Sequence, residues 1–172
     1  MSVILRTLRL ELRPCRLSDL NALHQLWISA DMRRFLFDDQ IISLEEARSF
    51  IVASQSSFAE RGYGLWLFFE QPRIVPPEIE PIAGFAGLLD SSEASPSLIF
   101  GTAPQLWQRG YAREAAAAVL RYAFDQRGLK RVIADVDEPN IASIRVLEAL
   151  GMRQTRRSIV NDRPLLYYES RN

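Results

Sequence analysis

The spacing of apolar and polar residues predicts several strands. Apolar and charged residues alternate over residues 7–14 (TLRLELRP), and this period of two is typical of a strand with one buried face. The unbroken apolar run at 65–70 (LWLFFE) favours a strand that is buried on both faces. Further strands are expected at 82–89, 97–102 and 131–136, and two more on either side of the turn NDRP at 161–164.

Helical patterns separate these strands. A first helix is expected to begin at Ser18 or Asp19, because either side chain can cap it. The motif SLEE places Ser43 three residues before a glutamate, which predicts a capping box and a helix that continues to about residue 60. Two later helices are expected at 111–126 and 140–150, since a glycine follows each of them and commonly ends a helix.

The order of these elements predicts an α/β fold with a mixed, mostly antiparallel sheet, a central parallel strand pair and about four helices. The parallel crossover consists of the strand at 97–102, the helix at 111–126 and the strand at 131–136. Ligands bind open α/β sheets at the C-terminal ends of such strands. A length of 172 residues with 48% hydrophobic residues suffices for one core, so a single domain over residues 1–172 is expected.

Charge and composition exclude several classes of function. The 21 basic and 21 acidic residues cancel, which removes the broad positive potential expected of a protein that binds nucleic acid or an anionic membrane. Arg6 and Arg9 interrupt the apolar N-terminal residues, so we expect no signal peptide, no transmembrane span and a cytoplasmic location. One cysteine, Cys15, and one histidine, His24, cannot form a disulfide or a usual His/Cys zinc site, so no metal is expected.

The segment WQRGYAREAA at 107–116 carries the first candidate chemistry, because it opens a helix directly after a strand of the parallel pair. A helix N-terminus has unpaired backbone N–H groups and a partial positive charge, so it can hold an anion. Gly110 and Ala112 keep the backbone accessible to a phosphate. Side-chain donors around the same point come from Gln108, Arg109 and Arg113. These features predict a pyrophosphate cradle; an ordinary loop with glycine in a tight turn is the alternative.

Two other phosphate motifs can be excluded. A Walker loop requires a lysine after its second glycine, and the only lysine of the chain, Lys130, is not in that context. A dinucleotide fingerprint requires GxGxxG after the first strand, whereas the cradle has one glycine and lies late in the chain.

A second candidate segment, DEPNIASIRVLEALGMR at 137–153, opens a helix after the neighbouring strand. Asn140 and Ser143 lie one turn apart at its start, on the same edge of the sheet as the cradle. Taken singly, Asn140 is best interpreted as the N-cap of the helix.

The runs WQRGYAREAAAAVLRYAF and PNIASIRVLEALGMR together resemble the GNAT N-acetyltransferase superfamily, in particular the branch that includes ribosomal-protein N-terminal alanine acetyltransferases. The similarity extends over most of the chain and is strongest at 97–153. The superfamily's loop pattern is Gln or Arg, two residues, Gly, one residue, then Gly or Ala. Gly110 and Ala112 match this pattern, whereas Trp107 occupies its first position.

The resemblance implies a GNAT-like acyl-CoA N-acyltransferase fold with acetyl-CoA as cofactor. It places the pyrophosphate on the N–H groups of Gln108, Arg109, Gly110, Tyr111, Ala112 and Arg113. It implies that the pantetheine arm pairs like an extra strand with Phe100, Gly101 and Thr102, next to Asn140, and that Ser143 lies near the thioester sulfur.

The implied reaction is transfer of an acetyl group to a primary amine, either a protein N-terminus or a small molecule, in a ternary complex. It requires a base for the amine, a backbone N–H for the oxyanion, and an acid for the thiolate, for which Ser143 is the candidate. Cys15 is expected to be structural, which disfavours a covalent relay. A non-catalytic acyl-CoA sensor or interaction module is the alternative function, and a homodimer is left open.

No single residue can be assigned as the base from the sequence. The candidates are loop carboxylates that also suit a solvated turn, namely Asp38, Asp39, Asp90 and Glu93. The segment at 32–42 (MRRFLFDDQII) is expected to bind the amine through Phe35, Phe37, Asp38 and Asp39, which combine apolar and acidic character. The alternative is that residues 35–37 belong to the core and the aspartates form a turn.

Overall fold

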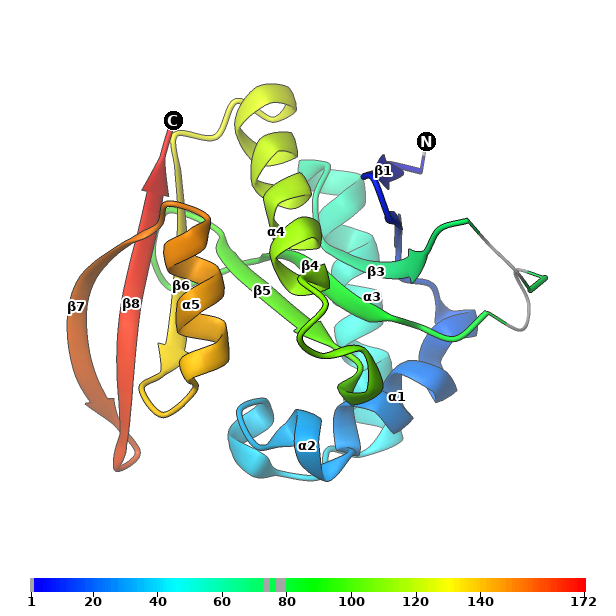
Figure 1. The fold of residues 1–172 in the computed structure, drawn as a ribbon, viewed down its shortest axis with the longest axis horizontal. Coiled ribbons are helices and arrows are strands. Elements are labelled where there is room, and N and C mark those ends of the chain that lie inside the picture. The colour runs from blue at the N-terminus through cyan, green and yellow to red at the C-terminus, as the bar shows by residue number, and fades with distance from the viewer. Residues whose placement is uncertain (1, 73–74, 77–79) are drawn as a thin grey trace.

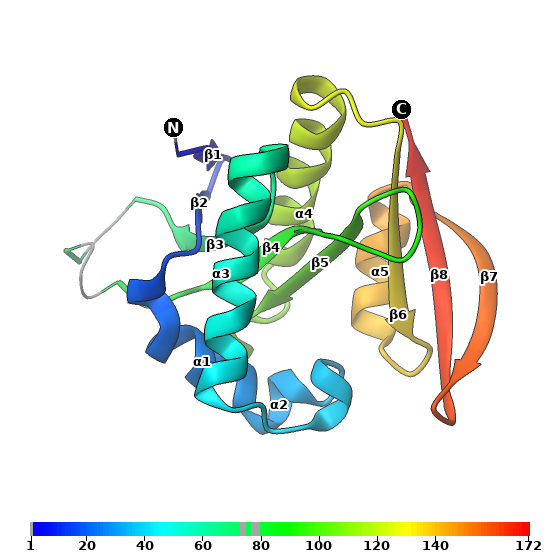
Figure 2. The ribbon, with the colours of Figure 1, turned by 180° about the vertical axis from the view of Figure 1, so that it is seen from behind.

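The chain forms an eight-stranded sheet with helices on both faces (Figures 1 and 2). The computed structural model describes residues 2–72, 75–76 and 80–172. The strands are β1 (Leu5–Arg6), β2 (Leu10–Pro14), β3 (Leu65–Glu70), β4 (Gly84–Leu89), β5 (Ser97–Thr102), β6 (Arg131–Asp137), β7 (Arg153–Val160) and β8 (Arg163–Arg171). The α-helices are α1 (Leu20–Ile28), α2 (Ala30–Arg33), α3 (Leu44–Arg61), α4 (Tyr111–Arg121) and α5 (Ile141–Ala149).

The sheet confirms the predicted topology. Its strand order is β1-β2-β3-β4-β5-β6-β8-β7, and every neighbouring pair is antiparallel except the central pair β5 and β6. The described residues contain five α-helices where about four were expected, because the short helix α2 lies within the segment predicted as a loop. None of the described helices is both long and apolar enough to cross a membrane.

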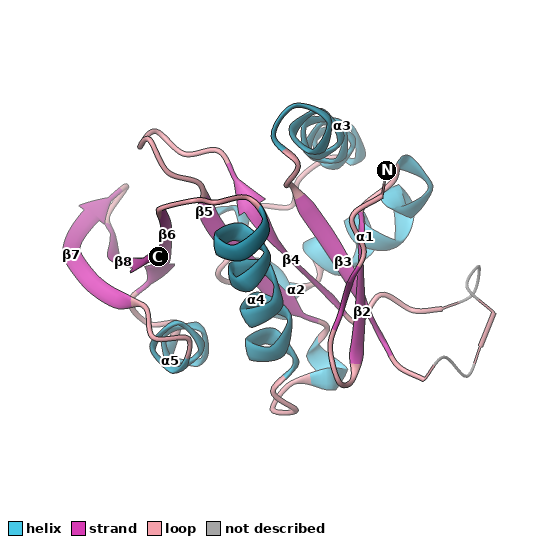
Figure 3. Cartoon of the chain, turned by 90° about the horizontal axis from the view of Figure 1, so that it is seen from above, coloured by secondary structure: helices cyan, strands magenta, loops and turns pink. Residues whose placement is uncertain are grey.

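Two layers of helices cover the sheet, α4 and α5 on one face and α1 and α3 on the other (Figure 3). Strand β3 explains this arrangement because alternate side chains of its apolar run point to opposite faces. Trp66 and Phe68 pack in the core beneath α4, whereas Leu67 packs in the core beneath α1 and α3. Each face of the sheet thus has a core of its own.

The central strands β5 and β6 separate soon after they pair (Figure 1). Their parallel register consists of the single pair Ser97 and Ile133. On the other side of β5, Ala103 donates its N–H to the carbonyl of Ala83 at 2.8 Å, so every second residue of β5 bonds to β4. The intervening residues, including Phe100, turn their N–H and C=O toward β6. A stretch of strand edge is therefore open in the middle of the sheet.

Several predicted boundaries differ from the structure. The strand expected at 7–14 is interrupted, because the Thr7 hydroxyl accepts the N–H of Leu10 at 3.0 Å and Leu8 is 92% exposed. The helix expected at 111–126 is α-helical only to Arg121, and its last turn, Tyr122–Gln126, is π-helical. The capping box is confirmed: the hydroxyl of Ser43 accepts the N–H of Glu46, whose carboxylate accepts the N–H of Ser43 in return.

Candidate active site

The N-terminus of α4 is open. Gly110 occupies the N-cap position with φ of 79°, and no side chain caps the helix. A Cβ placed on Gly110 would have one atom within 4 Å, Nη2 of Arg9 at 3.5 Å, so the space beside this glycine is accessible. Gln108 also has a positive φ of 63°. The free N–H groups of the first turn can therefore hold an anion such as a phosphate.

Side chains around this loop hold it in place. The indole Nε1 of Trp107 donates to the carbonyl of Thr102 at 2.7 Å, which ties the loop to the end of β5. The Tyr111 hydroxyl donates to Glu70 at 2.6 Å, and this hydrogen bond raises the pKa of Tyr111. Arg109 lies 3.6 Å from the same carboxylate, so its guanidinium faces Glu70. Of the predicted side-chain donors, Gln108 and Arg113 are exposed.

The end of β5 contains a buried polar atom without a partner. The Thr102 hydroxyl makes no hydrogen bond in the described part of the chain, although the residue is only 7% exposed. Its neighbours two and four residues back in β5 pack in the core beneath α4, so Thr102 faces α4. The unpaired hydroxyl, the open strand edge at Phe100 and the uncapped helix all fit a ligand that combines amides with phosphates.

A cleft of about 310 Å³ runs through the gap between β5 and β6. Its walls come from both sides of the sheet. The side of α5 contributes Asn140 and Ser143, and the opposite side contributes residues 35–38, which follow α2 and include Phe35 and Phe37. Asp135 and Asp137 of β6 line the same cleft. A ligand in the gap can therefore be reached from both faces of the sheet.

Asn140 is the N-cap of α5, as its position in the sequence predicted. Its side-chain oxygen accepts the N–H of Ser143 at 3.2 Å, so Asn140 is the N-cap of the helix. Ser143 is half-buried, and its hydroxyl makes no hydrogen bond with the residues that the structure describes. This hydroxyl is free to act on a group in the cleft.

Asp135 and Asp137 are functional candidates that the sequence-based prediction missed. They lie two residues apart in β6, so both face the side of the sheet opposite α5. Asp135 is exposed to solvent inside the cleft, yet the surrounding walls limit its hydration. This loss of hydration, followed by the charge of Asp137, raises the pKa of Asp135. Burial also raises the pKa of Asp137, although its ion pair with Arg163 at 3.1 Å opposes this shift.

The pattern of RVIADVD shows that these two carboxylates share one face of β6, because they stand two positions apart in the strand. It does not show that this face borders a cleft, which depends on how β5 and β6 pack.

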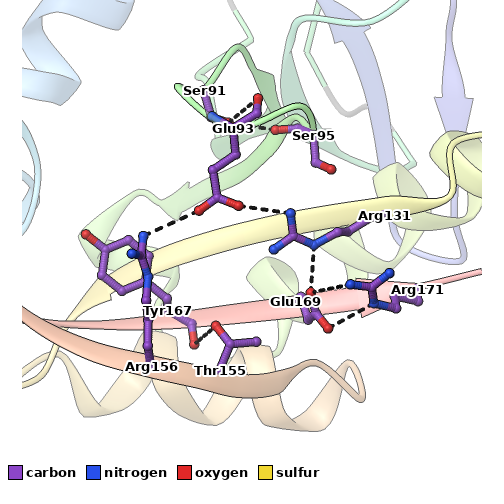
Figure 4. A network of polar contacts seen from close by, with 9 residues as sticks. All are labelled: Ser91, Glu93, Ser95, Arg131, Thr155, Arg156, Tyr167, Glu169 and Arg171. Atoms are coloured by element: carbon purple, nitrogen blue, oxygen red, sulfur yellow. Dashed lines mark hydrogen bonds and ion pairs between the residues drawn. The ribbon is translucent and has the colours of Figure 1, made fainter.

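The loop carboxylates proposed as bases have other partners. Asp90 forms an ion pair with Arg61. Glu93 lies between two guanidiniums, at 2.9 Å from Arg131 and 3.4 Å from Arg156, in a network that extends to β8 (Figure 4). Neither Asp90 nor Glu93 lines the central cleft; both line a second cavity, next to the turn that precedes β5.

The predicted amine-binding segment divides into two parts. Phe35, Phe37 and Asp38 line the cleft, and Asp38 forms an ion pair with Arg163 at 3.0 Å. Asp39 does not line the cleft and lies 3.6 Å from Arg33. Both aromatic residues are half-buried, and Phe37 also packs against the core beneath α1 and α3.

Cys15 and His24 lie outside the cleft. Cys15 is 2% exposed in the core beneath α1 and α3, and burial raises the pKa of its thiol to about 11. A thiol in this state is a poor nucleophile at neutral pH. The His24 ring nitrogen Nε2 lies 2.8 Å from the carbonyl of Ile42, a packing role. The described residues contain no group of three or more His, Cys, Asp or Glu that could hold a metal.

This geometry agrees with comparisons to known proteins. The model of the acetyltransferase (GNAT) domain family matches residues 9–153. The chain therefore belongs to the GNAT acetyltransferase family.

Relatives of known sequence and structure extend this result. The uncharacterized protein YkkB of Bacillus subtilis is 32% identical over 123 residues, which cover 66% of this chain and 65% of YkkB. The FsC-acetyl coenzyme A-N(2)-transacetylase of Aspergillus fumigatus is 32% identical over 98 residues, which cover 53% of this chain and 39% of that enzyme. The structure of RimL, a ribosomal L7/L12 alpha-N-protein acetyltransferase in complex with coenzyme A, superposes with a TM-score of 0.79 at 18% identity, covering 98% of both chains. At this identity, the RimL comparison establishes the fold.

Proposed function

We propose that the chain is an acetyl-CoA-dependent N-acetyltransferase that acts as one domain over its 172 residues. The observation that carries this proposal is the uncapped N-terminus of α4 beside the open edge of β5. At both places backbone hydrogen-bonding groups have no partner within the protein, so they can bind the amides and phosphates of a ligand. Family membership, and the coenzyme A and transacetylase named for the relatives, support the same function.

The residues around the gap fit coenzyme A in two parts. The N–H groups at the start of α4, with Gln108 and Arg113 nearby, would hold the pyrophosphate. The carbonyl of Phe100 and the buried hydroxyl of Thr102 would bond the pantetheine amides, and Asn140 lies across the gap. Bound acetyl-CoA would supply the activated acetyl group as a thioester.

The chain's own groups can move the protons that the transfer requires. Asp135, on the side of the sheet opposite α5, would take the proton from the incoming amine. A raised pKa suits this role, because a base works best when its pKa approaches the working pH. Ser143, on the α5 side, would give a proton to the departing thiolate, directly or through water. The N–H of Phe100, at the open edge of β5, would steady the developing oxyanion.

The acceptor would be a primary amine, either a protein N-terminus or a small molecule, held between Phe35, Phe37 and Asp38. The accessible Asp135 and the buried Cys15 favour direct transfer in a ternary complex over a covalent relay. A cytoplasmic location and a homodimer are both compatible with this activity.

The activity can be measured as release of coenzyme A thiol from acetyl-CoA with a panel of peptides and small amines, together with the mass of the acetylated product. We expect amine-dependent thiol release matched by product. Tight binding of acetyl-CoA without turnover of any amine would instead favour a non-catalytic sensor.

A further inference from the structure

Arg9 reaches the cradle from the opposite end of the chain. It precedes β2, and its Nη1 donates to the backbone carbonyl of Arg109 at 2.9 Å. Its Nη2 lies 3.5 Å from the position that a Cβ on Gly110 would occupy. The guanidinium also lies over the ring of Tyr111, 4.7 Å from its centroid. Arg9 therefore contacts the three residues at which the loop turns into α4.

Glu114 holds Arg9 in this position. One carboxylate oxygen accepts Nε at 2.7 Å and Nη2 at 2.6 Å, and the other accepts the backbone N–H of Arg9 at 2.9 Å and the hydroxyl of Thr7. Burial alone would raise the pKa of Glu114, but these hydrogen bonds outweigh it and lower the pKa. The Arg9 guanidinium is thus fixed by a charged partner on α4 itself and has little freedom to rotate.

The bond to the Arg109 carbonyl sets the orientation of a peptide plane. In a trans peptide the C=O and the following N–H point in opposite directions. Because the carbonyl of Arg109 points at Arg9, the N–H of Gly110 points to the other side of the loop. The loop contains two left-handed residues, Gln108 and Gly110; this conformation costs little at glycine but is strained at Gln108, and it persists there when surrounding contacts hold it.

We propose that Arg9 is a positioning residue for the cofactor: it fixes the Arg109 carbonyl and thereby prearranges the cradle N–H groups for a diphosphate. This role rests on the proposed function, because it concerns the same cofactor site. It predicts that Arg9 matters for ligands that carry the diphosphate and not for the thioester chemistry.

Two ligands separate these effects. Acetyl-CoA carries the diphosphate, whereas S-acetyl-pantetheine carries the same thioester without it. We expect Arg9→Met to weaken acetyl-CoA binding in calorimetry by about tenfold, the size of one charge-assisted hydrogen bond, and to raise its KM without changing kcat. The kcat/KM for S-acetyl-pantetheine should stay within about twofold of wild type. Arg6→Met is the matched control, because Arg6 lies in the same hairpin and pairs with Glu11 at 3.1 Å, with 70% of its side chain exposed.

If Arg9→Met unfolds, Arg9→Lys can be used for the same measurements, because it retains the positive charge. A lysine has the charge but cannot bond Glu114 and the Arg109 carbonyl with one planar group, so acetyl-CoA binding should still weaken. Wild-type affinity in a folded Arg9 variant would overturn the proposal, and so would an equal loss with S-acetyl-pantetheine. Folded wild type that binds no acetyl-CoA would instead overturn the proposed function.

Discussion

The helices α4 and α5 begin on the same face of the sheet and satisfy their first N–H groups in different ways. At α5 the side chain of Asn140 caps the helix, whereas at α4 Gly110 leaves the N–H groups without a side-chain cap. One N–H group at the start of α5 is bonded within the protein, whereas the start of α4 has no side-chain cap and can bind an external anion. We infer that the α4 side binds the cofactor and that the α5 side, with Ser143 and the facing Asp135, carries the chemistry.

The N-terminus of α4 has no side-chain cap, but side-chain contacts still hold it in place. Glu70 bonds Tyr111, and Glu114 bonds Arg9. These contacts hold the first turn of α4 through its side chains, so they fix the backbone without using its N–H groups. Prearrangement of this kind reduces the entropy lost on binding.

The largest expected effect separates chemistry from binding. Asp135→Asn removes the proposed base, so we expect kcat to fall by about 100-fold or more while the Kd for acetyl-CoA is unchanged. The matched control is Asp125→Asn, an exposed aspartate outside the cleft. Steady-state kinetics with calorimetry would measure both quantities. Full activity of Asp135→Asn would remove Asp135 from the mechanism.

Asp135→Asn should also change how thermal stability depends on pH. Because the pKa of Asp135 is raised in the folded state, folding favours its protonated form, and this stabilisation is lost as the pH rises through the raised pKa. Asp135→Asn should therefore melt at a higher temperature than wild type at neutral pH, and the difference should shrink as the pH is lowered. Thermal melts over this range would measure it. An unchanged difference across the range would contradict the pKa shift.

Ser143→Ala tests the acid on the α5 side. A serine hydroxyl is a weak acid that water can partly replace, so we expect kcat to fall by about tenfold with little change in acetyl-CoA affinity. Ser158→Ala is a suitable control, since Ser158 lies in β7 and does not line the cleft. A loss of cofactor affinity without a loss of kcat would instead place Ser143 with the binding groups.

Asp137→Asn should change the pH profile. The charge of Asp137 helps to raise the pKa of Asp135, so its removal should lower that pKa. The base would then remain ionised to lower pH, and the acid limb of kcat/KM should move down by less than about one pH unit. Measuring both proteins with one amine cancels the titration of the acceptor. A shift to higher pH would be inconsistent with Asp135 as the base.

The smallest effects are expected from variants that remove the N-caps of α3 and α5. Asn140→Ala and Ser43→Ala each remove an N-cap, so each should reduce the free energy of unfolding by about 1 kcal/mol. Because Asn140 also lines the cleft and Ser43 does not, only Asn140→Ala should weaken acetyl-CoA binding. Denaturation curves and calorimetry would measure the two effects. Equal affinity in both variants would restrict Asn140 to its cap.

The sequence was sufficient to predict the topology and the open helix. Helix α3 and its capping box, the parallel crossover and the glycine at the start of α4 are local features, so short patterns predict them. The interruption of the first strand was not predicted, because the alternation over 7–14 does not show that Thr7 and Leu10 close a turn; the Thr7 hydroxyl in that turn also bonds Glu114, which is 107 residues away.

The catalytic side was harder to predict, for a physical reason. Asp135 is a candidate because it lines the gap that opens where β5 and β6 diverge after one residue pair. This divergence depends on packing, which local sequence patterns do not reveal. The loop carboxylates suggested instead, such as Glu93, lie within ion pairs formed with distant arginines. A pattern shows which residues share a face, and it does not show which charges have partners.

The central claim is that the free N–H groups of α4 bind the cofactor, and calorimetry with acetyl-CoA on two aspartate variants tests it most directly. Gly110→Asp adds a side chain and a negative charge at the N-terminus of α4, where the phosphates would bind. Gly151→Asp is the control, because Gly151 has the same φ of 79° and no atom near its Cβ position. We predict that wild type and Gly151→Asp bind alike and that Gly110→Asp binds at least about 100-fold more weakly, or ~2.7 kcal/mol. Wild-type affinity in folded Gly110→Asp would contradict the claim.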